Sequence, residues 1–532
     1  MVRVPVYFLC VALTAHAQTT AERWWQHVQF LADDKLEGRN TGSEGHRLAT
    51  QYAADQFKAI GLQPAGLNGW FQPVPFDTRQ IDETGSSLAI VAGGKETKLT
   101  LGKEAFISMR AEPAPAVRAQ MVFVGHALQV PEMDYDDLRG VDLKGKIAVF
   151  INGAPKGWPG PLSSHVQTAA YRWAALRKAG AIGVATIAKV QTTPWVRGAA
   201  ARVQMQMSAR MPGMEEEGGQ QIQVTVNPEH AGMFFEGTGH TLAELLKLSD
   251  GTTPMPHFAL NKELVATAKV KKGTVDSQNV VALLPGKKKE YVVVSAHIDH
   301  TGKMTTFAGD GIFNGAMDNA SGVAAVIEVA RQLKAAGPLE RSVLFVLVTG
   351  EEKGLQGSRY FARMPTVARK KLVADCNMDM FMPIHELKAL TLLGVDESTL
   401  GDKAREVAAT FNLPVIPDPI PEQNRFTRSD QYSFIREGIP ALAFKFGYTK
   451  GSEEEKLQTE WLRTRYHAVS DDLSQPVNKE AAGRFTEYLA ALVKKTANDK
   501  DKPAWKKTSF FKRFARYKRR QSDSAGLVSL NC

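Results

Sequence analysis

Residues 292–322 read VVVSAHIDHTGKMTTFAGDGIFNGAMDNASG and join a short apolar run to a loop rich in Gly and Asn. The run that begins at Tyr291 is mostly β-branched, which is typical of a buried parallel strand. His297 and Asp299 follow where that strand should end, and open α/β sheets bind ligands outside the carboxyl ends of their strands. Asp318 lies in the loop that follows, and a helical pattern begins just after it. This strand–loop–helix unit suggests a metal site, provided that other segments supply further ligands.

Other strand ends carry suitable side chains. A second apolar run at 342–348 leads into Glu351 and Glu352, and such adjacent carboxylates are costly to desolvate without a cation or hydrogen bonds. A third predicted strand carries Asp379 near its end, and His467 lies in a loop before the last predicted helix. The five potential metal ligands are therefore His297, Asp318, Glu352, Asp379 and His467. Glu351 remains available as a general base.

Five motifs occur in a fixed order along the chain: H-x-D, G-A-x-D-N-x-S-G, E-E-x-G-x-x-G-S, N-M-D-M and Y-H-x-x-x-D-D. This series resembles the M28 family of two-zinc exopeptidases, and the likeness extends over roughly residues 24–496. The resemblance implies an α/β zinc-exopeptidase core with a mixed, largely parallel sheet flanked by helices. It also implies an inserted β-rich protease-associated (PA) domain, as some members of the family carry.

The resemblance assigns a role to each candidate residue. Asp318 would bridge two Zn²⁺ ions; His297 and Asp379 would complete the site of one ion, and Glu352 and His467 that of the other. Glu351 would act as the general base toward water, and Asp299 would orient the imidazole of His297.

Gln431 marks a departure from the family pattern. In some members this position holds a His or Tyr that polarises the scissile carbonyl. The amide of Gln431 could still donate a hydrogen bond there, but it cannot act as an acid.

The chain of 532 residues is long enough for several domains. We expect a signal peptide at 1–17, the first part of the peptidase domain at 18–114, a PA insert at 115–265, the metal-binding core at 266–498 and a basic, aromatic tail at 499–532 that is disordered.

Residues 1–17 combine a short cationic start, an apolar run and a final A-x-A sequence, so we expect a cleavable signal and a secreted or periplasmic protein. The apolar run is too short to cross a bilayer, and we expect no transmembrane segment. Three cysteines exclude a disulfide framework.

The net charge of +10 is located mainly at the end of the chain. Residues 500–532 hold ten Lys or Arg against two Asp, which accounts for +8 of that charge. The rest of the chain is nearly neutral, so we expect no specific nucleic-acid partner. Aromatic residues interleave with the basic ones in this tail, a composition that could give weak contact with anionic surfaces. The sequence does not indicate an oligomeric state.

A secreted two-zinc aminopeptidase acting on peptides is the leading functional hypothesis. A carboxypeptidase of the same fold is the first alternative, because Arg359, Arg425 and Arg428 lie near the motifs and could bind a terminal carboxylate. A single-zinc enzyme resembling glutaminyl cyclases is the second, although the five-ligand set argues against it. A non-catalytic, receptor-like module ranks last, because no ligand is missing.

Overall fold

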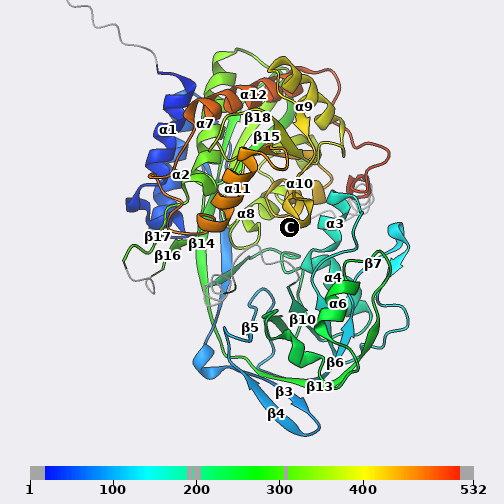
Figure 1. Ribbon diagram of the computed structural model, residues 1–532. Helices are drawn as coiled ribbons and strands as arrows, with labels where there is room; N and C mark the ends of the chain where they lie inside the picture. The colour runs from blue at the N-terminus through cyan, green and yellow to red at the C-terminus, as the bar shows by residue number, and fades with distance from the viewer. Residues whose placement is uncertain (1–17, 189–194, 196–204, 305–308, 516–532) are drawn as a thin grey trace, which may run out of the picture.

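The computed structural model describes residues 18–188, 195, 205–304 and 309–515, and these residues form two bodies built around separate sheets (Figure 1). We call the upper body in Figure 1 the core domain and the lower body the insert. The expected signal peptide lies outside the described residues. Within the described ranges, no helix has both the length and the apolar character that crossing a bilayer requires.

The core domain is built on a mixed sheet that has ten strands among the described residues. Its spatial order is β11 (Gln206–Ala209), β2 (Phe71–Ile81), β14 (Val270–Leu284), β18 (Arg341–Val348), β15 (Lys288–His297), β19 (Leu372–Asn377), β22 (Ala441–Phe446), β20 (Leu390–Leu393) and β21 (Val415–Ile416), and β1 (Gln63–Pro64) pairs with β14. The four strands from β18 to β22 pair in parallel, whereas β11, β2 and β14 pair antiparallel at one side. The predicted α/β class with a mixed sheet is confirmed, with the parallel pairing concentrated at the centre.

Successive residues of the central strands point to opposite faces of the sheet, as strand geometry requires. Val292 and Val294 of β15 belong to one apolar cluster, and Val293 between them belongs to another. Because both faces are buried, β15 reads as a continuous apolar run. The helices that cover the first face are α1 (Thr20–Leu31), α2 (Glu44–Ile60), α7 (Ser321–Ala335), α9 (Thr399–Thr410) and α12 (Lys479–Asn498); the second face is covered by α8 (Gln356–Arg363) and α10 (Gln431–Arg436).

The insert is built on a second sheet, of eight strands among the described residues. Its order is β4 (Lys95–Leu99), β3 (Ser87–Ala92), β13 (His257–Thr267), β6 (Ala116–Val124), β9 (Ile147–Ile151), β10 (Gly183–Ile187), β12 (Ile222–Val226) and β5 (Ala105–Ile107). α4 (Ala169–Lys178) covers one face and α6 (Leu242–Leu248) the other. The predicted strand–helix–strand order β9–α4–β10 is present.

The boundary predicted between residues 114 and 115 falls inside this second sheet. β3 and β5 precede that boundary and yet pair with β13 and β12 of the insert. The segment β11 shows the opposite exchange, because it lies within the insert's part of the sequence and pairs with β2 of the core domain. The two bodies therefore share strands, and a single cut in the sequence cannot separate them.

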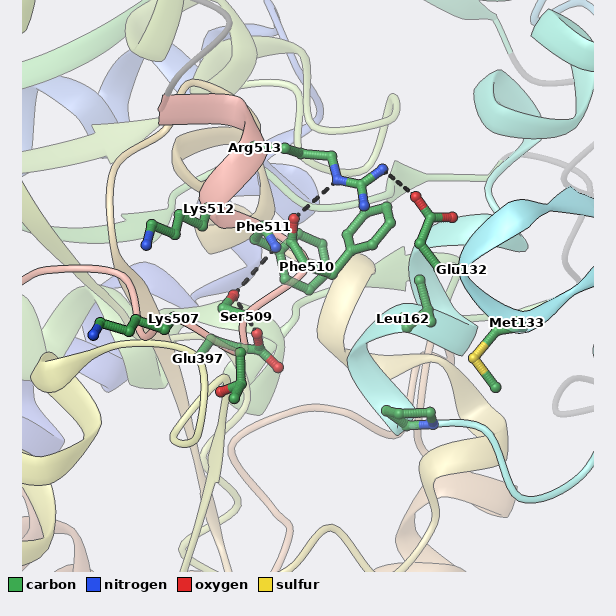
Figure 2. A pocket seen from close by; sticks show the side chains of 12 residues that line it. Glu132, Met133, Leu162, Glu397, Lys507, Ser509, Phe510, Phe511, Lys512 and Arg513 are labelled. Atoms are coloured by element: carbon green, nitrogen blue, oxygen red, sulfur yellow. Dashed lines mark hydrogen bonds and ion pairs between the residues drawn. The ribbon is translucent and has the colours of Figure 1, made fainter.

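The prediction that the tail 499–532 is disordered is wrong for residues 499–515, while 516–532 lie outside the described residues. Phe511 is fully buried in the apolar cluster on the second face of the core sheet. The indole of Trp505 donates to the carbonyl of Gly438 at 2.8 Å. Arg513 forms an ion pair of 2.6 Å with Glu132 of the insert (Figure 2). This part of the tail therefore contacts both bodies, and its aromatic residues pack against protein.

Candidate metal centre

The carboxyl ends of three neighbouring parallel strands deliver most of the candidate ligands. His297 is the last residue of β15, and Glu351 and Glu352 follow β18 closely. Asp379 comes two residues after the end of β19. Because parallel neighbours end at the same edge of the sheet, these side chains meet there. The strand ends predicted from the sequence thus converge on one site.

Asp318 lies in the short helical turn Ala316–Ala320 that precedes α7, and a network of hydrogen bonds fixes this turn. The backbone N–H groups of Met317 and Asp318 donate to the carboxylate of Asp471 at 2.9 and 3.0 Å. Asn319 donates through its side-chain amide to the carbonyl of Met378 at 2.9 Å. The loop is therefore tied to the end of β19, which holds the Asp318 carboxylate over the strand ends.

Two glycines in this loop are required by close contacts. Gly315 has φ of 61°, and a Cβ there would lie 2.1 Å from the carbonyl oxygen of Asp318. A Cβ at Gly322 would lie 2.3 Å from the side-chain oxygen of Asn319. Any larger residue at these two positions would displace the turn that carries Asp318.

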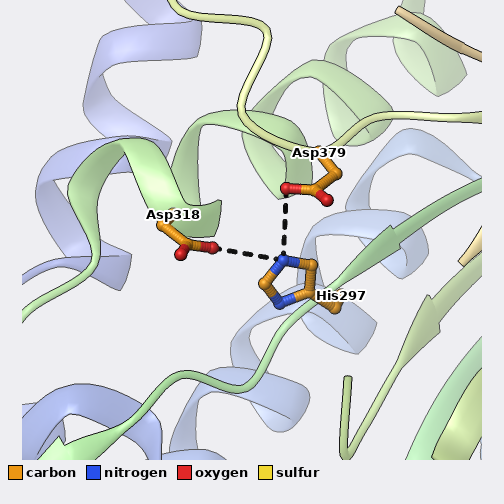
Figure 3. Close-up of side chains that lie close together, drawn as sticks. All are labelled: His297, Asp318 and Asp379. Atoms are coloured by element: carbon orange, nitrogen blue, oxygen red, sulfur yellow. Dashed lines mark ion pairs between the residues drawn. The ribbon is translucent and has the colours of Figure 1, made fainter. Parts of the chain in front are cut away.

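The first group of ligands consists of His297, Asp318 and Asp379 (Figure 3). The Nε2 atom of His297 lies 3.3 Å from Oδ1 of Asp318 and 3.5 Å from Oδ1 of Asp379. All three side chains are at least 90% buried. The Nδ1 atom of His297 lies 3.1 Å from the backbone carbonyl of Asp299, which can hold the ring with Nε2 facing the carboxylates.

The second group surrounds the other oxygen of Asp318. The Nε2 atom of His467 lies 3.2 Å from Oδ2 of Asp318 and 3.2 Å from Oε2 of Glu352. The ring of Tyr466 stacks on His467 with centroids 4.0 Å apart. Asp318 therefore presents one oxygen to each group, as a carboxylate that bridges two ions would.

These separations fit a metal site. Ligand atoms about 2.0–2.1 Å from one tetrahedral zinc ion lie about 3.3–3.4 Å from each other. The four separations that join each imidazole to its carboxylates, from 3.2 to 3.5 Å, scatter around that value. Imidazole and carboxylate ligands together also suit zinc. The residues present therefore fit two zinc ions that share Asp318.

His300 is a further candidate ligand that the sequence analysis missed. Its Nδ1 atom lies 2.9 Å from Oε1 of Glu352 and 3.9 Å from Oδ2 of Asp318, and its side chain is fully buried. His300 thus forms a second potential ligand group with Asp318 and Glu352. The only sequence signal was a second imidazole directly after the H-x-D motif, in a position where strand alternation no longer predicts direction.

The buried charges perturb one another strongly. Burial raises the pKa of Asp318, but the neighbouring imidazoles, led by His300, outweigh it and hold the pKa well below its usual range. Burial opposes the charging of His297, yet Glu351 and the hydrogen bonds to the first group's carboxylates raise its pKa well above its usual range. Such tightly packed acids and imidazoles are typical of a functional site.

The pKa values of Glu351 and its neighbour Glu352 are shifted in opposite directions. Burial, with the charges of Glu352 and Asp430, raises the pKa of Glu351 well above its usual range. For Glu352, attraction by His467 outweighs burial and lowers the pKa. Glu352 contacts two imidazoles, whereas Glu351 is in neither of the two ligand groups and lines the adjoining cleft. The structure thus places Glu352, and not Glu351, among the candidate ligands, and the role of Glu351 as a base stays a prediction.

The structure corrects the predicted contact of Asp299 with His297. The Asp299 carboxylate accepts hydrogen bonds from the hydroxyl of Thr41 at 2.8 Å and from the backbone N–H of Glu351 at 3.1 Å. Its backbone carbonyl, and not its carboxylate, faces the His297 ring. Asp299 therefore positions the Glu351 backbone as well as the imidazole.

The predicted role of Gln431 at a substrate carbonyl is wrong on this geometry. The side chain is fully buried at the start of α10. Its amide nitrogen donates to the carbonyl of Phe426 at 2.8 Å, and its oxygen accepts from Asn377 at 3.0 Å. Both ends of the amide are thus occupied inside the protein. Arg428, three residues earlier, lines the cleft instead.

The comparisons with known proteins agree with this site. Residues 279–493 match Peptidase family M28. Aminopeptidase YwaD of Bacillus subtilis strain 168 is 26% identical over 254 residues, which cover 46% of this chain and 50% of that protein. The alkaline phosphatase isozyme conversion protein of Escherichia coli K12 is 27% identical over 232 residues, which cover 40% and 66%. The matched region thus spans half to two thirds of these relatives.

Among solved structures, the aminopeptidase from Aneurinibacillus sp. strain AM-1 has a TM-score of 0.52 at 20% identity, over 90% of this chain and 95% of that one. This likeness shows a shared fold over both bodies. The family match at residues 279–493 includes all five predicted ligands and the additional His300. Through residues 279–493, this chain is therefore similar to peptidase family M28.

Proposed function

We propose that this protein is a two-zinc metallo-aminopeptidase that removes N-terminal residues from peptides. The observation that carries the proposal is the placement of Asp318, whose two oxygens face His297 and His467 at 3.3 and 3.2 Å. A bridging carboxylate of this kind supports two ions that act on one substrate. His297 and Asp379 would hold one ion; Glu352 and His467, with His300 beside them, would hold the other.

When bound, zinc would lower the pKa of water toward ~7 and polarise the scissile carbonyl. Glu351 is the residue best placed to act as the base. Its backbone is held by the Asp299 carboxylate, and its side chain lines the cleft beside the ligands. Glu351 would accept the proton of the attacking water and pass it to the leaving amine.

Two observations favour cleavage at the N-terminus of the peptide over cleavage at the C-terminus. Relatives of similar sequence or fold carry the name aminopeptidase. Two of the three arginines that suggested a carboxypeptidase are paired with acids, Arg359 with Glu216 and Arg425 with Asp418. We therefore place the carboxypeptidase second.

Export and the identity of the insert complete the proposal. The leader pattern at residues 1–17 supports a secreted or periplasmic protein. The mixed β-rich sheet of the insert, with the β9–α4–β10 unit, supports a PA domain.

The test uses the full chain after dialysis, with zinc measured by elemental analysis and hydrolysis followed on matched free and N-acetylated peptides. We expect about two zinc ions per chain, hydrolysis of the free-amine peptides and none of the acetylated ones. Equal hydrolysis of both forms with release of C-terminal residues would establish the carboxypeptidase. A single ion in fully active protein would contradict the two-zinc site and favour a cyclase-like enzyme.

A further inference from the structure

A cleft of about 350 Å³ lies beside the metal centre, between the core domain and the insert. Metal-site residues and arginines line it together. They include Glu351, Glu352 and His467 from the metal centre, and Arg110, Arg359, Arg363, Arg428 and Arg436. Arg110 belongs to the insert, while the other four belong to the core domain. A substrate in this cleft would therefore meet guanidinium groups on both walls.

Three of these arginines share the carboxylate of one glutamate. Glu216, which is largely buried, lies 3.3 Å from Arg359, 3.3 Å from Arg363 and 2.5 Å from Arg436. Arg363 also lies 3.4 Å from Glu437. These three side chains are therefore held in place by carboxylates of the protein.

Arg428 differs from them. Its Nη2 atom donates to the hydroxyl of Tyr466 at 3.2 Å, and among the described residues it forms no ion pair with a carboxylate. The side chain is exposed, and it lies in the lining of the cleft. Arg110, on the opposite wall, is likewise exposed and forms no ion pair within the described ranges. The cleft thus presents unpaired positive charge next to the proposed reaction site.

The contacts of Arg428 place its guanidinium near the proposed zinc ligands. Tyr466 stacks on His467, and the same tyrosine receives the hydrogen bond from Arg428. The guanidinium is therefore one tyrosine side chain away from a proposed zinc ligand. A substrate carboxylate bound at Arg428 would therefore belong to a residue close to the scissile bond.

We propose that Arg428 binds a carboxylate of the substrate and thereby gives the enzyme a preference for peptides with an acidic group close to the scissile bond. The inference rests on the proposed peptidase function. A guanidinium suits this task because its planar donors match a carboxylate in two parallel hydrogen bonds. The carboxylate can come from an acidic side chain or from the C-terminus of a short peptide.

The experiment compares three substrates that share a free N-terminal leucine: Leu-Glu-amide, Leu-Gln-amide and Leu-Gln with a free C-terminus. The first pair isolates a side-chain carboxylate, and the second pair isolates a terminal one. We expect the wild-type enzyme to favour one of the acidic forms over Leu-Gln-amide by about tenfold or more in kcat/KM, as for one charge-assisted contact. The gain should weaken as salt is added.

Arg428→Gln should abolish this preference, measured as the ratio of the two kcat/KM values within each pair of substrates, and Arg428→Lys should keep part of it. Arg425→Gln is the matched control, because Arg425 is paired with Asp418 outside the cleft lining. A preference that survives Arg428→Gln, or that is lost instead in Arg110→Gln, would overturn the assignment. Absence of any preference in the wild type would overturn it as well. Failure of the proposed function is distinguishable, since the two amides would then not be hydrolysed, whereas a carboxypeptidase could still cleave Leu-Gln with its free C-terminus.

Discussion

Substitution of Phe511 by Ala tests whether the ordered part of the tail stabilises the enzyme. The ring is fully buried, and its centroid lies 5.1 Å from that of Phe426 and 5.7 Å from that of His165 in the insert. Truncating a buried Phe to Ala costs about 3–5 kcal/mol. Because whole domains are stable by only about 5–15 kcal/mol, we expect a large loss of stability from a residue outside every sequence motif.

The assay is urea unfolding followed by tryptophan fluorescence, since Trp505 lies in the same segment. With a slope of about 3 kcal/mol per M, a loss of about 3–5 kcal/mol should lower the midpoint of the core-domain transition by roughly 1–1.7 M. Phe511→Leu should lose much less of the free energy of unfolding. A chain ending at residue 515 keeps every contact named here and serves as the control. An unchanged midpoint for Phe511→Ala would refute the view that the tail is part of the fold.

Three further predictions concern the site and the interface. Glu351→Gln should retain both zinc ions in elemental analysis and lose about 10²–10⁴-fold in kcat, because it removes a base and no ligand. Glu352→Gln should instead lose zinc. The reverse result would show that the two residues have exchanged roles. His300→Ala should lower the zinc content or change the visible spectrum of the cobalt-substituted protein, and an unaltered content and spectrum would show that His300 is no ligand. Burial, with two nearby arginines, lowers the pKa of His165 to about 3, so the unfolded chain binds a proton there below pH 6.5 while the folded protein does not. The free energy of unfolding should therefore fall as pH drops from about 6.5 to 3, by on the order of 4 kcal/mol for this group. In urea unfolding at several pH values, the free energy of unfolding of His165→Phe should decrease less steeply with falling pH than that of the wild type. An equal dependence on pH in the two proteins would contradict this account.

The central strands and the candidate ligands at their ends could be predicted because local pattern and a general rule act together. The apolar runs before His297 and Glu351 each identify a buried strand. Parallel strands then place the residues after them at one edge of the sheet. His300 escaped this reasoning because it lies beyond the strand, where the loop geometry decides its direction.

Features that depend on distant pairing could not be predicted. β3 pairs with β13 across more than 150 residues, so nothing local assigned it to the insert. The basic and aromatic composition of the tail fits a surface segment equally well, and only contacts such as Arg513 with Glu132 decide otherwise. Gln431 matched a motif position, but the burial of that position depends on the packing of α10.

The exchange of strands between the two bodies has a consequence for motion. The chain enters the insert after β2 and returns along β14, and these strands pair up to Ile81 and Val270. β11 crosses back to extend the core sheet at β2, and Arg513 fastens the tail to the far side of the insert. A hinge needs one soft connection, but here three separate attachments would have to yield together. The cleft should therefore keep a nearly constant width, and the size of a peptide that can enter it is set by the fold rather than by opening and closing of the domains.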